Sequence, residues 1–254
     1  MSLKQYQNLW LNALYSPPLA LSDALSEHEK GHLQNWHEAH PMHQAIQEQT
    51  LVYFYQQLPP SVKKLARPDR INTALLDFFD VYKHCAAETT QQVQIQLLRF
   101  LADYPEAGTL HFAELCRYEA HVKSLDFYQL PKAFPLCAGP QLASWARVIY
   151  LGPYFPLVWS ALQQPHTQIK DFLQWPLQPA TPYLLLQEFK GVRLEKITPL
   201  LADCLLQCLG EKPWDSIVAE VIQRHPECDA QSDTETLKHA AQAYLQAGIL
   251  LRSS

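Results

Sequence analysis

The chain has 254 residues, of which 48% are apolar and 18% are charged, and its formal net charge is −5. This is an ordinary globular composition, and the length allows two domains with substantial cores. Seven glycines against nineteen prolines favour helices separated by proline joints. No glycine-rich loop of the kind that binds phosphates occurs, which argues against a nucleotide-binding α/β enzyme. No apolar run is long enough to span a bilayer, so we expect no membrane partner.

The first residues predict a cytoplasmic protein. The segment from Met1 to Leu14 is interrupted by polar side chains and lacks the apolar centre of a signal peptide. In that compartment the six cysteines are expected to be thiols. Cys204 and Cys208 are one helical turn apart on an apolar face, which is typical of packed thiols and not of metal ligands.

The region before residue 163 has the periodicity of helices, and its breaks contain proline or glycine. We predict a mainly helical domain over residues 1–162 and a linker rich in Gln and Pro over 163–180. The predicted helices are Leu3 to Tyr15, Pro18 to Trp36, His43 to Leu58, Pro68 to Ala86, Val93 to Tyr104, Leu110 to Tyr128 and Gln141 to Tyr150.

Residues 181–254 are predicted to form a separate α+β module that begins with a hairpin. An apolar run from Tyr183 to Leu186 is followed by a turn at Lys190-Gly191 and by the alternating segment Val192 to Ile197. Thr198-Pro199 then has the form of a helix start, because threonine caps the first turn and proline lacks only an N–H that would be unpaired there.

Three short amphipathic helices are expected after the hairpin. The first ends at Gly210, the second runs from Pro213 to Pro226, and the third opens at a capping box beginning at Ser232 and ends at Gly248. A hairpin with three helices is a winged-helix-like module, which can bind DNA or peptides. From Pro179 onward the sequence contains seven basic and ten acidic side chains, which gives a net charge of −3. This charge disfavours DNA, although a winged-helix transcriptional regulator remains an alternative.

The blocks of this module resemble, in order and spacing, the PqqD-like precursor-recognition domain of peptide-modifying pathways. The matching blocks are Tyr183 to Leu186, Gly191 to Leu194, Leu209 to Glu211, Ile217 to Ile222 and Tyr244 to Leu250. The resemblance implies that the leader of a ribosomally made precursor peptide adds as a strand beside the hairpin and packs on the last helix. An exposed strand edge suits this role, because its backbone groups are unpaired.

The resemblance implies a set of peptide-binding residues on the second hairpin strand and on the last helix. They are Val192, Arg193, Leu194, Glu195, Lys196, Ile197, Leu237, Lys238, Ala241 and Tyr244. Burial in the core of a small domain is the competing interpretation for the apolar members.

Two further stretches are similar to the helical partner proteins of multinuclear non-haem iron peptide-modifying oxidases, the TglI, MbnC and HvfC-type companions. They are Leu97 to Leu101 with Leu110 to Lys123, and Tyr154 to Trp159. The arginines of an early motif of those proteins are missing at Gln49 to Gln56, so no functional residue is transferred to the first hundred positions. In this family the iron belongs to the partner enzyme, so no cofactor is expected here.

The aromatic residues Tyr150, Tyr154, Phe155 and Trp159 form a candidate surface for docking on the oxidase, with interdomain core as the competing interpretation. The complete prediction is a non-catalytic subunit that presents a leader peptide to an iron-dependent oxidase in a heterodimer. Cysteine is the candidate modified residue.

A metal-dependent enzyme is the third alternative, because five of the eleven histidines lie between His28 and His43. His28-Glu29-Lys30-Gly31-His32 matches a zinc-protease pattern, but Gly31 lies inside the helix that the pattern requires. Exposed surface histidines are the competing interpretation of the cluster, and His28, His32 and His37 are its candidate ligands.

Overall fold

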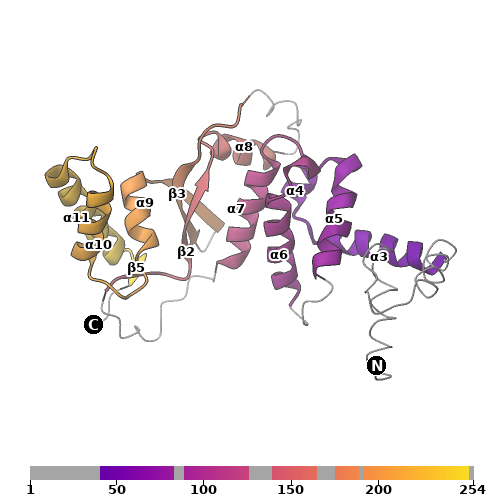
Figure 1. Ribbon diagram of the computed structural model, residues 1–254, viewed down its shortest axis with the longest axis horizontal. Coiled ribbons are helices and arrows are strands. Elements are labelled where there is room, and N and C mark those ends of the chain that lie inside the picture. The colour runs from indigo at the N-terminus through magenta and orange to yellow at the C-terminus, as the bar shows by residue number, and fades with distance from the viewer. Residues whose placement is uncertain (1–40, 83–88, 126–138, 165–174, 189–190, 252–254) are drawn as a thin grey trace, which may run out of the picture. The chain divides into compact units, whose positions relative to one another are not determined.

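The computed structural model describes residues 41–82, 89–125, 139–164, 175–188 and 191–251. Contacts divide the chain into two compact units, Met1–Thr109 and Leu110–Ser254. The predicted fold class is confirmed: the described chain is mainly helical, with a small antiparallel sheet beside the C-terminal helices (Figure 1). No helix in these ranges is both long enough and apolar enough to cross a membrane.

The first unit is helical in its described parts. Its elements are α3 (Pro41–Gln57), α4 (Pro60–Leu65), α5 (Pro68–Tyr82), α6 (Thr90–Ala102) and the 3-10 helix η2 (Pro105–Ala107). Helix α6 begins at a capping box in which Thr89 and Gln92 satisfy each other's backbone N–H groups. Phe78 packs edge-on against Phe54 and at a tilt against Phe100, which joins α5 to α3 and α6. The two helices predicted before residue 37 lie outside the described residues.

The second unit is built on the three-stranded sheet β2-β3-β4. Its elements are α7 (Phe112–Ser124), β1 (Gln141–Leu142), β2 (Ala146–Leu151), α8 (Phe155–Leu162), β3 (Thr181–Glu188), β4 (Gly191–Lys196), α9 (Pro199–Leu206), α10 (Trp214–Arg224), α11 (Ala230–Gln246) and β5 (Leu250–Leu251). The predicted hairpin is confirmed, with Leu185 opposite Leu194 in its antiparallel register.

Strand β3 is central, which explains its continuous apolar sequence. A strand with neighbours on both sides and helices on both faces buries every side chain, so the alternation of a half-exposed strand disappears. Leu184 and Leu186 lie on the face that packs against α9 to α11, whereas Tyr183 and Leu185 point to the opposite face. In Figure 1, α7 and α9 lie on opposite sides of β2 and β3.

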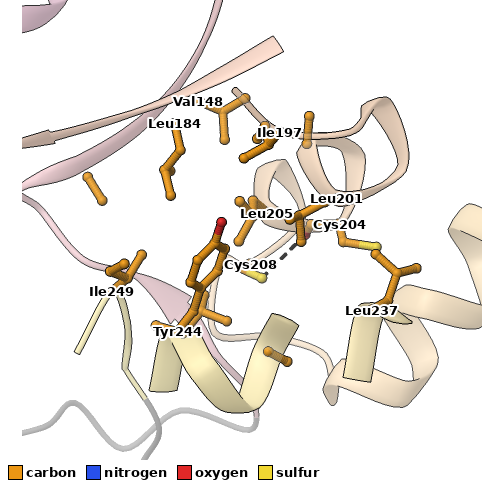
Figure 2. Close-up of a cluster of buried hydrophobic side chains, with 14 of the residues drawn as sticks. Val148, Leu184, Ile197, Leu201, Cys204, Leu205, Cys208, Leu237, Tyr244 and Ile249 are labelled. Carbon is orange, nitrogen blue, oxygen red and sulfur yellow. Dashed lines mark hydrogen bonds between the residues drawn. The ribbon is translucent and has the colours of Figure 1, made fainter. Parts of the chain in front are cut away.

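The core under α9 to α11 is apolar and contains two thiols (Figure 2). Leu205 and Tyr244 point into it from α9 and α11, and Cys208 donates its thiol hydrogen to the carbonyl of Cys204 over 3.3 Å. Burial raises the pKa of both thiols to about 12, so they stay protonated at neutral pH. The prediction that Cys204 and Cys208 are packed thiols is confirmed.

The helix predicted over Gln141 to Tyr150 is wrong. The segment forms β1, which pairs with β5, and β2, which pairs with β3. Its apolar side chains are compatible with the period of a helix or of a strand. Pairing with the edge of β3 favours the strand, because side chains on both faces of Ala146 to Leu151 can then be buried. The sheet therefore includes residues that precede the predicted linker, and the predicted boundaries at 162 and 181 fall inside the second compact unit.

Two helix ends of the terminal module also differ from the prediction. Helix α11 begins at Ala230 because Asp229 accepts hydrogen bonds from the backbone N–H groups of Gln231 and Ser232, one turn before the predicted capping box. Helix α9 starts as predicted, with the Thr198 side chain accepting from the Leu201 N–H, but its α-helical part ends at Leu206, ahead of Gly210.

Candidate peptide-binding edge

Strand β4 is an edge of the described sheet, since β3 is its one neighbour in the strand order β2-β3-β4. The Ile197 N–H donates to the carbonyl of Pro182 over 3.2 Å, and Ile197 directly precedes α9. Hydrogen-bonded and non-hydrogen-bonded pairs alternate in an antiparallel ladder. The backbone groups of Lys196, Leu194 and Val192 therefore point away from β3.

The other side of β3 supports this assignment. Gln187 is the register partner of Val192, and its N–H donates to the Trp145 carbonyl over 2.9 Å, in the direction of β2. Gln187 thus makes its backbone bond away from β4, and the Val192 backbone faces outward. Three residues at strand spacing present N–H and C=O groups that an added strand can use.

A charged row lies along β4 on the face that carries α11. The Arg193 guanidinium is 3.0 Å from Glu188 and 3.6 Å from Glu195, and all three side chains are 40–54% exposed. The Tyr244 hydroxyl donates to Glu195 over 3.3 Å. Burial and the nearby Glu195 carboxylate raise the pKa of Tyr244 to about 12, so it remains a neutral donor.

The predicted peptide-binding residues divide into two groups. Val192, Arg193, Leu194, Glu195, Lys196 and Lys238 are at least partly exposed, whereas Ile197, Leu237, Ala241 and Tyr244 are buried. Figure 2 shows Leu237 and Tyr244 directed into the hydrophobic core, so these side chains belong to the domain interior. Among the buried members, Tyr244 also donates a hydrogen bond from its hydroxyl to Glu195 of β4.

The four aromatic residues predicted to form a docking surface differ in exposure and come from two elements, β2 and the start and body of α8. Tyr150 lies in β2, is 42% exposed, and places its hydroxyl 3.5 Å from Asp203 of α9. Phe155 is fully buried at the start of α8, so its side chain is core. Trp159 packs on Tyr118 with ring centroids 4.7 Å apart, and Tyr154 lies at the helix start, so the segment from Tyr150 is not one aromatic helix.

A buried polar network that no sequence pattern predicted lies on the other face of the sheet. The Nδ1 atom of His111 is 2.8 Å from Glu114, and its Nε2 atom is 2.9 Å from the Trp175 carbonyl. The other oxygen of Glu114 accepts the Gly152 N–H over 2.6 Å. His111 itself has φ +68°, a left-handed conformation that is uncommon outside glycine.

Hydrogen-bonding rules fix one proton of this network. A carbonyl oxygen only accepts, so Nε2 of His111 carries a proton, and Nδ1 can donate a second one to the Glu114 carboxylate. Burial lowers the pKa of His111, but the hydrogen bonds to Glu114 and Trp175 outweigh it and leave the pKa above its ordinary value. Both ring nitrogens are occupied and the ring is buried, so this network anchors α7 to the loop after β2 and is not an open catalytic site.

The predicted metal ligands cannot be placed. His28, His32 and His37 lie outside the described residues, as does the side chain of His43 at the end of that cluster. Within the described ranges, no three His, Cys, Asp or Glu side chains gather in a way that could hold a metal ion.

Comparisons with known proteins do not assign the chain to a family. No protein-family model matches the chain, and the search of curated proteins finds no match. The resemblances to precursor-recognition domains and to oxidase partner proteins therefore remain predictions from the quoted residues.

Proposed function

We propose that the chain is a non-catalytic partner subunit that holds the leader of a ribosomally made precursor peptide as an added strand on β4. The observation that carries the proposal is the outward-pointing backbone of Val192, Leu194 and Lys196 at the sheet edge. An added strand gains its affinity from main-chain hydrogen bonds, and alternate side chains supply specificity. Arg193 and Glu195 would meet the peptide on the face of α11, and Val192 and Leu194 on the other.

The matched substitutions Leu194→Pro and Leu194→Ala test this proposal. The Leu194 N–H points away from β3, so proline there removes no β3–β4 bond but removes a donor to the peptide and blocks its approach. The ligand is unidentified, so the probe is a fluorescein-labelled dodecamer selected on the intact chain from a random display library. We expect Leu194→Pro to weaken binding by about tenfold or more and Leu194→Ala to retain most of it.

Fluorescence anisotropy measures both affinities, and circular dichroism checks that both variants fold. Equal binding by Leu194→Pro and the unchanged chain would show that the peptide does not add to β4. If no peptide is selected at all, the recognition function itself is wrong.

The proposal includes a partner enzyme, an iron-dependent oxidase that modifies the presented peptide at cysteine. Large apolar side chains on the surface of the first unit suit a docking role, among them Val52 and Tyr53 of α3, which are 56% and 44% exposed. Co-expression with an iron protein encoded by a neighbouring gene should yield a complex whose peptide-modifying activity depends on the leader. Peptide modification by the isolated chain would contradict the non-catalytic role.

The DNA-binding alternative makes the opposite prediction in a gel-shift assay. The last helix of a winged-helix DNA reader needs basic side chains, whereas Lys238 of α11 is accompanied by Asp233 and Glu235. We expect no shift of duplex DNA at moderate salt. A shift that persists there would favour the regulator over the peptide-binding subunit.

A further inference from the structure

Strand β4 is complementary to itself when it is reversed about Leu194. Reading outward from that residue, Arg193 on one side corresponds to Glu195 on the other, and Val192 corresponds to Lys196. Opposite charges placed directly across a strand pair stabilise it, and like charges destabilise it. The strand therefore carries both halves of a charge-matched antiparallel pair in one sequence.

The backbone restricts how two copies of this edge can meet. Val192, Leu194 and Lys196 point their backbone groups outward, so in a symmetric pair these residues must face one another across the new ladder. The allowed registers are thus centred on residues 192 to 196. A register centred on Arg193 opposes two arginines, one centred on Glu195 opposes two glutamates, and one centred on Lys196 opposes two lysines.

The register centred on Leu194 avoids all of these repulsions and keeps the full strand paired. It places Leu194 against Leu194 of the second copy and Arg193 against Glu195 of the second copy, twice by symmetry. The Arg193 and Glu195 positions are the non-hydrogen-bonded pairs of this register, in which cross-strand side chains approach most closely. A register centred on Val192 pairs fewer residues of β4 and brings no opposite charges together.

We infer that β4 is a self-association edge, through which two copies of the chain form an antiparallel pair centred on Leu194. The two three-stranded sheets then join into one, β2-β3-β4 continuing into β4-β3-β2 of the second copy. Such a pair also covers the backbone groups that a leader would use. This competition rests on the proposed function, whereas the pairing itself does not.

Charge reversal tests the register directly. Arg193→Glu alone opposes two pairs of glutamates, and Glu195→Arg alone opposes two pairs of arginines. We expect each single variant to weaken the dimer by about tenfold or more. Mixing the two variants restores both attractive pairs, as does the double variant R193E/E195R within one chain.

Sedimentation equilibrium of the full chain over a concentration series gives the dissociation constants. Arg99→Glu on α6 is the control, since it changes the charge by the same amount as Arg193→Glu on an exposed residue outside β4. The expected result is dimers for the unchanged chain, the control, the mixture and the double variant, with weakened dimers for the two singles. A monomeric unchanged chain, or single variants that dimerise as tightly as the control, would overturn the inference.

The same variants separate this inference from the proposed function. If the labelled peptide binds a chain that is monomeric throughout, the self-association is wrong and peptide binding stands. If the charge-reversal pattern appears but no peptide is selected, the pairing stands and the proposed function fails. If both hold, added peptide should dissociate the dimer, and a dimer that persists with saturating peptide would contradict the shared edge.

Discussion

Both faces of the β2-β3-β4 sheet bury apolar side chains, but the face opposite α9 to α11 also holds a buried polar network. The face under α9 to α11 is covered by apolar side chains and two thiols, with Leu205 and Cys208 near its centre. The opposite face carries the buried polar network of His111 and Glu114, anchored at the Gly152 N–H. Apolar contacts are many and individually weak, whereas a buried network depends on each of its few members. Truncations under α9 to α11 should therefore cost stability in proportion to the volume removed, whereas loss of one network member on the opposite face should cost more.

The largest effect is expected from Glu114→Ala. Removing this carboxylate leaves Nδ1 of His111 and the Gly152 N–H without their partner in a buried site. Loss of one member of a buried ion pair destabilises a protein by about 3–5 kcal/mol. Urea unfolding followed by tryptophan fluorescence measures the change. Glu106→Ala, at an exposed residue of η2, should have little effect. A loss below about 1 kcal/mol for Glu114→Ala would show that the network is not structural.

The apolar face should respond more mildly to Leu205→Ala. Leu205 is 1% exposed in the core under α9, so shortening it creates a cavity that costs about 2–4 kcal/mol. The next residue gives a matched control, because Leu206 is 50% exposed on the same helix and its truncation should cost little. Equal losses for the two variants in urea unfolding would contradict the placement of α9 on the sheet.

Gly152→Ala should have a smaller effect that depends on Glu114. A Cβ atom at residue 152 would lie 2.7 Å from Oε1 of Glu114, so the carboxylate or the loop must shift. Such overpacking costs about 1–3 kcal/mol. In a Glu114→Ala background the atom it meets is gone, so a double-mutant cycle should show a clear coupling energy. Purely additive losses would mean that Gly152 is required for another reason.

These two faces also mark the limit of what the sequence could predict. The hairpin and the start of α9 were predicted because their signals are local, such as the Thr198-Pro199 cap. The same local reasoning made Gln141 to Tyr150 a helix, because an apolar segment takes its period from the partner it pairs with.

The buried network gave no local signal at all. Glu114 reaches Gly152 across 38 positions, and His111 reaches the Trp175 carbonyl across 64. A positive φ at a histidine has no sequence pattern, and a glutamate in an amphipathic helix resembles a surface residue until its partners are known. The edge geometry of β4 was foreseeable from the hairpin, but β2, which pairs with the other hairpin strand β3, was not.

A second histidine, His225, tests whether burial, and not ion pairing alone, accounts for the large loss of stability expected from Glu114→Ala. His225 follows α10, with Nε2 2.9 Å from Asp203 and Nδ1 3.1 Å from Glu227. It resembles His111 in its two bonded nitrogens but is partly exposed to solvent. Exposed pairs contribute little because water and salt screen them. Replacing His225 by Gln should therefore cost far less than Glu114→Ala.

The direction of the pKa shift of His225 determines how its contribution to the free energy of unfolding changes with pH. The hydrogen bond to Asp203, followed by that to Glu227, raises the pKa of His225 above its ordinary 6.5. A raised pKa in the folded state stabilises the protein fully below the unfolded value and loses that contribution as pH rises through the folded value. Glu227, whose pKa is lowered, acts oppositely, losing its contribution only in more acidic solution as pH falls through its folded value. The difference in unfolding free energy between the unchanged chain and His225→Gln should thus be largest in weakly acidic solution and vanish in alkaline solution. Urea unfolding across that range measures it, and a difference that grows with pH would mean that His225 is held in its neutral form.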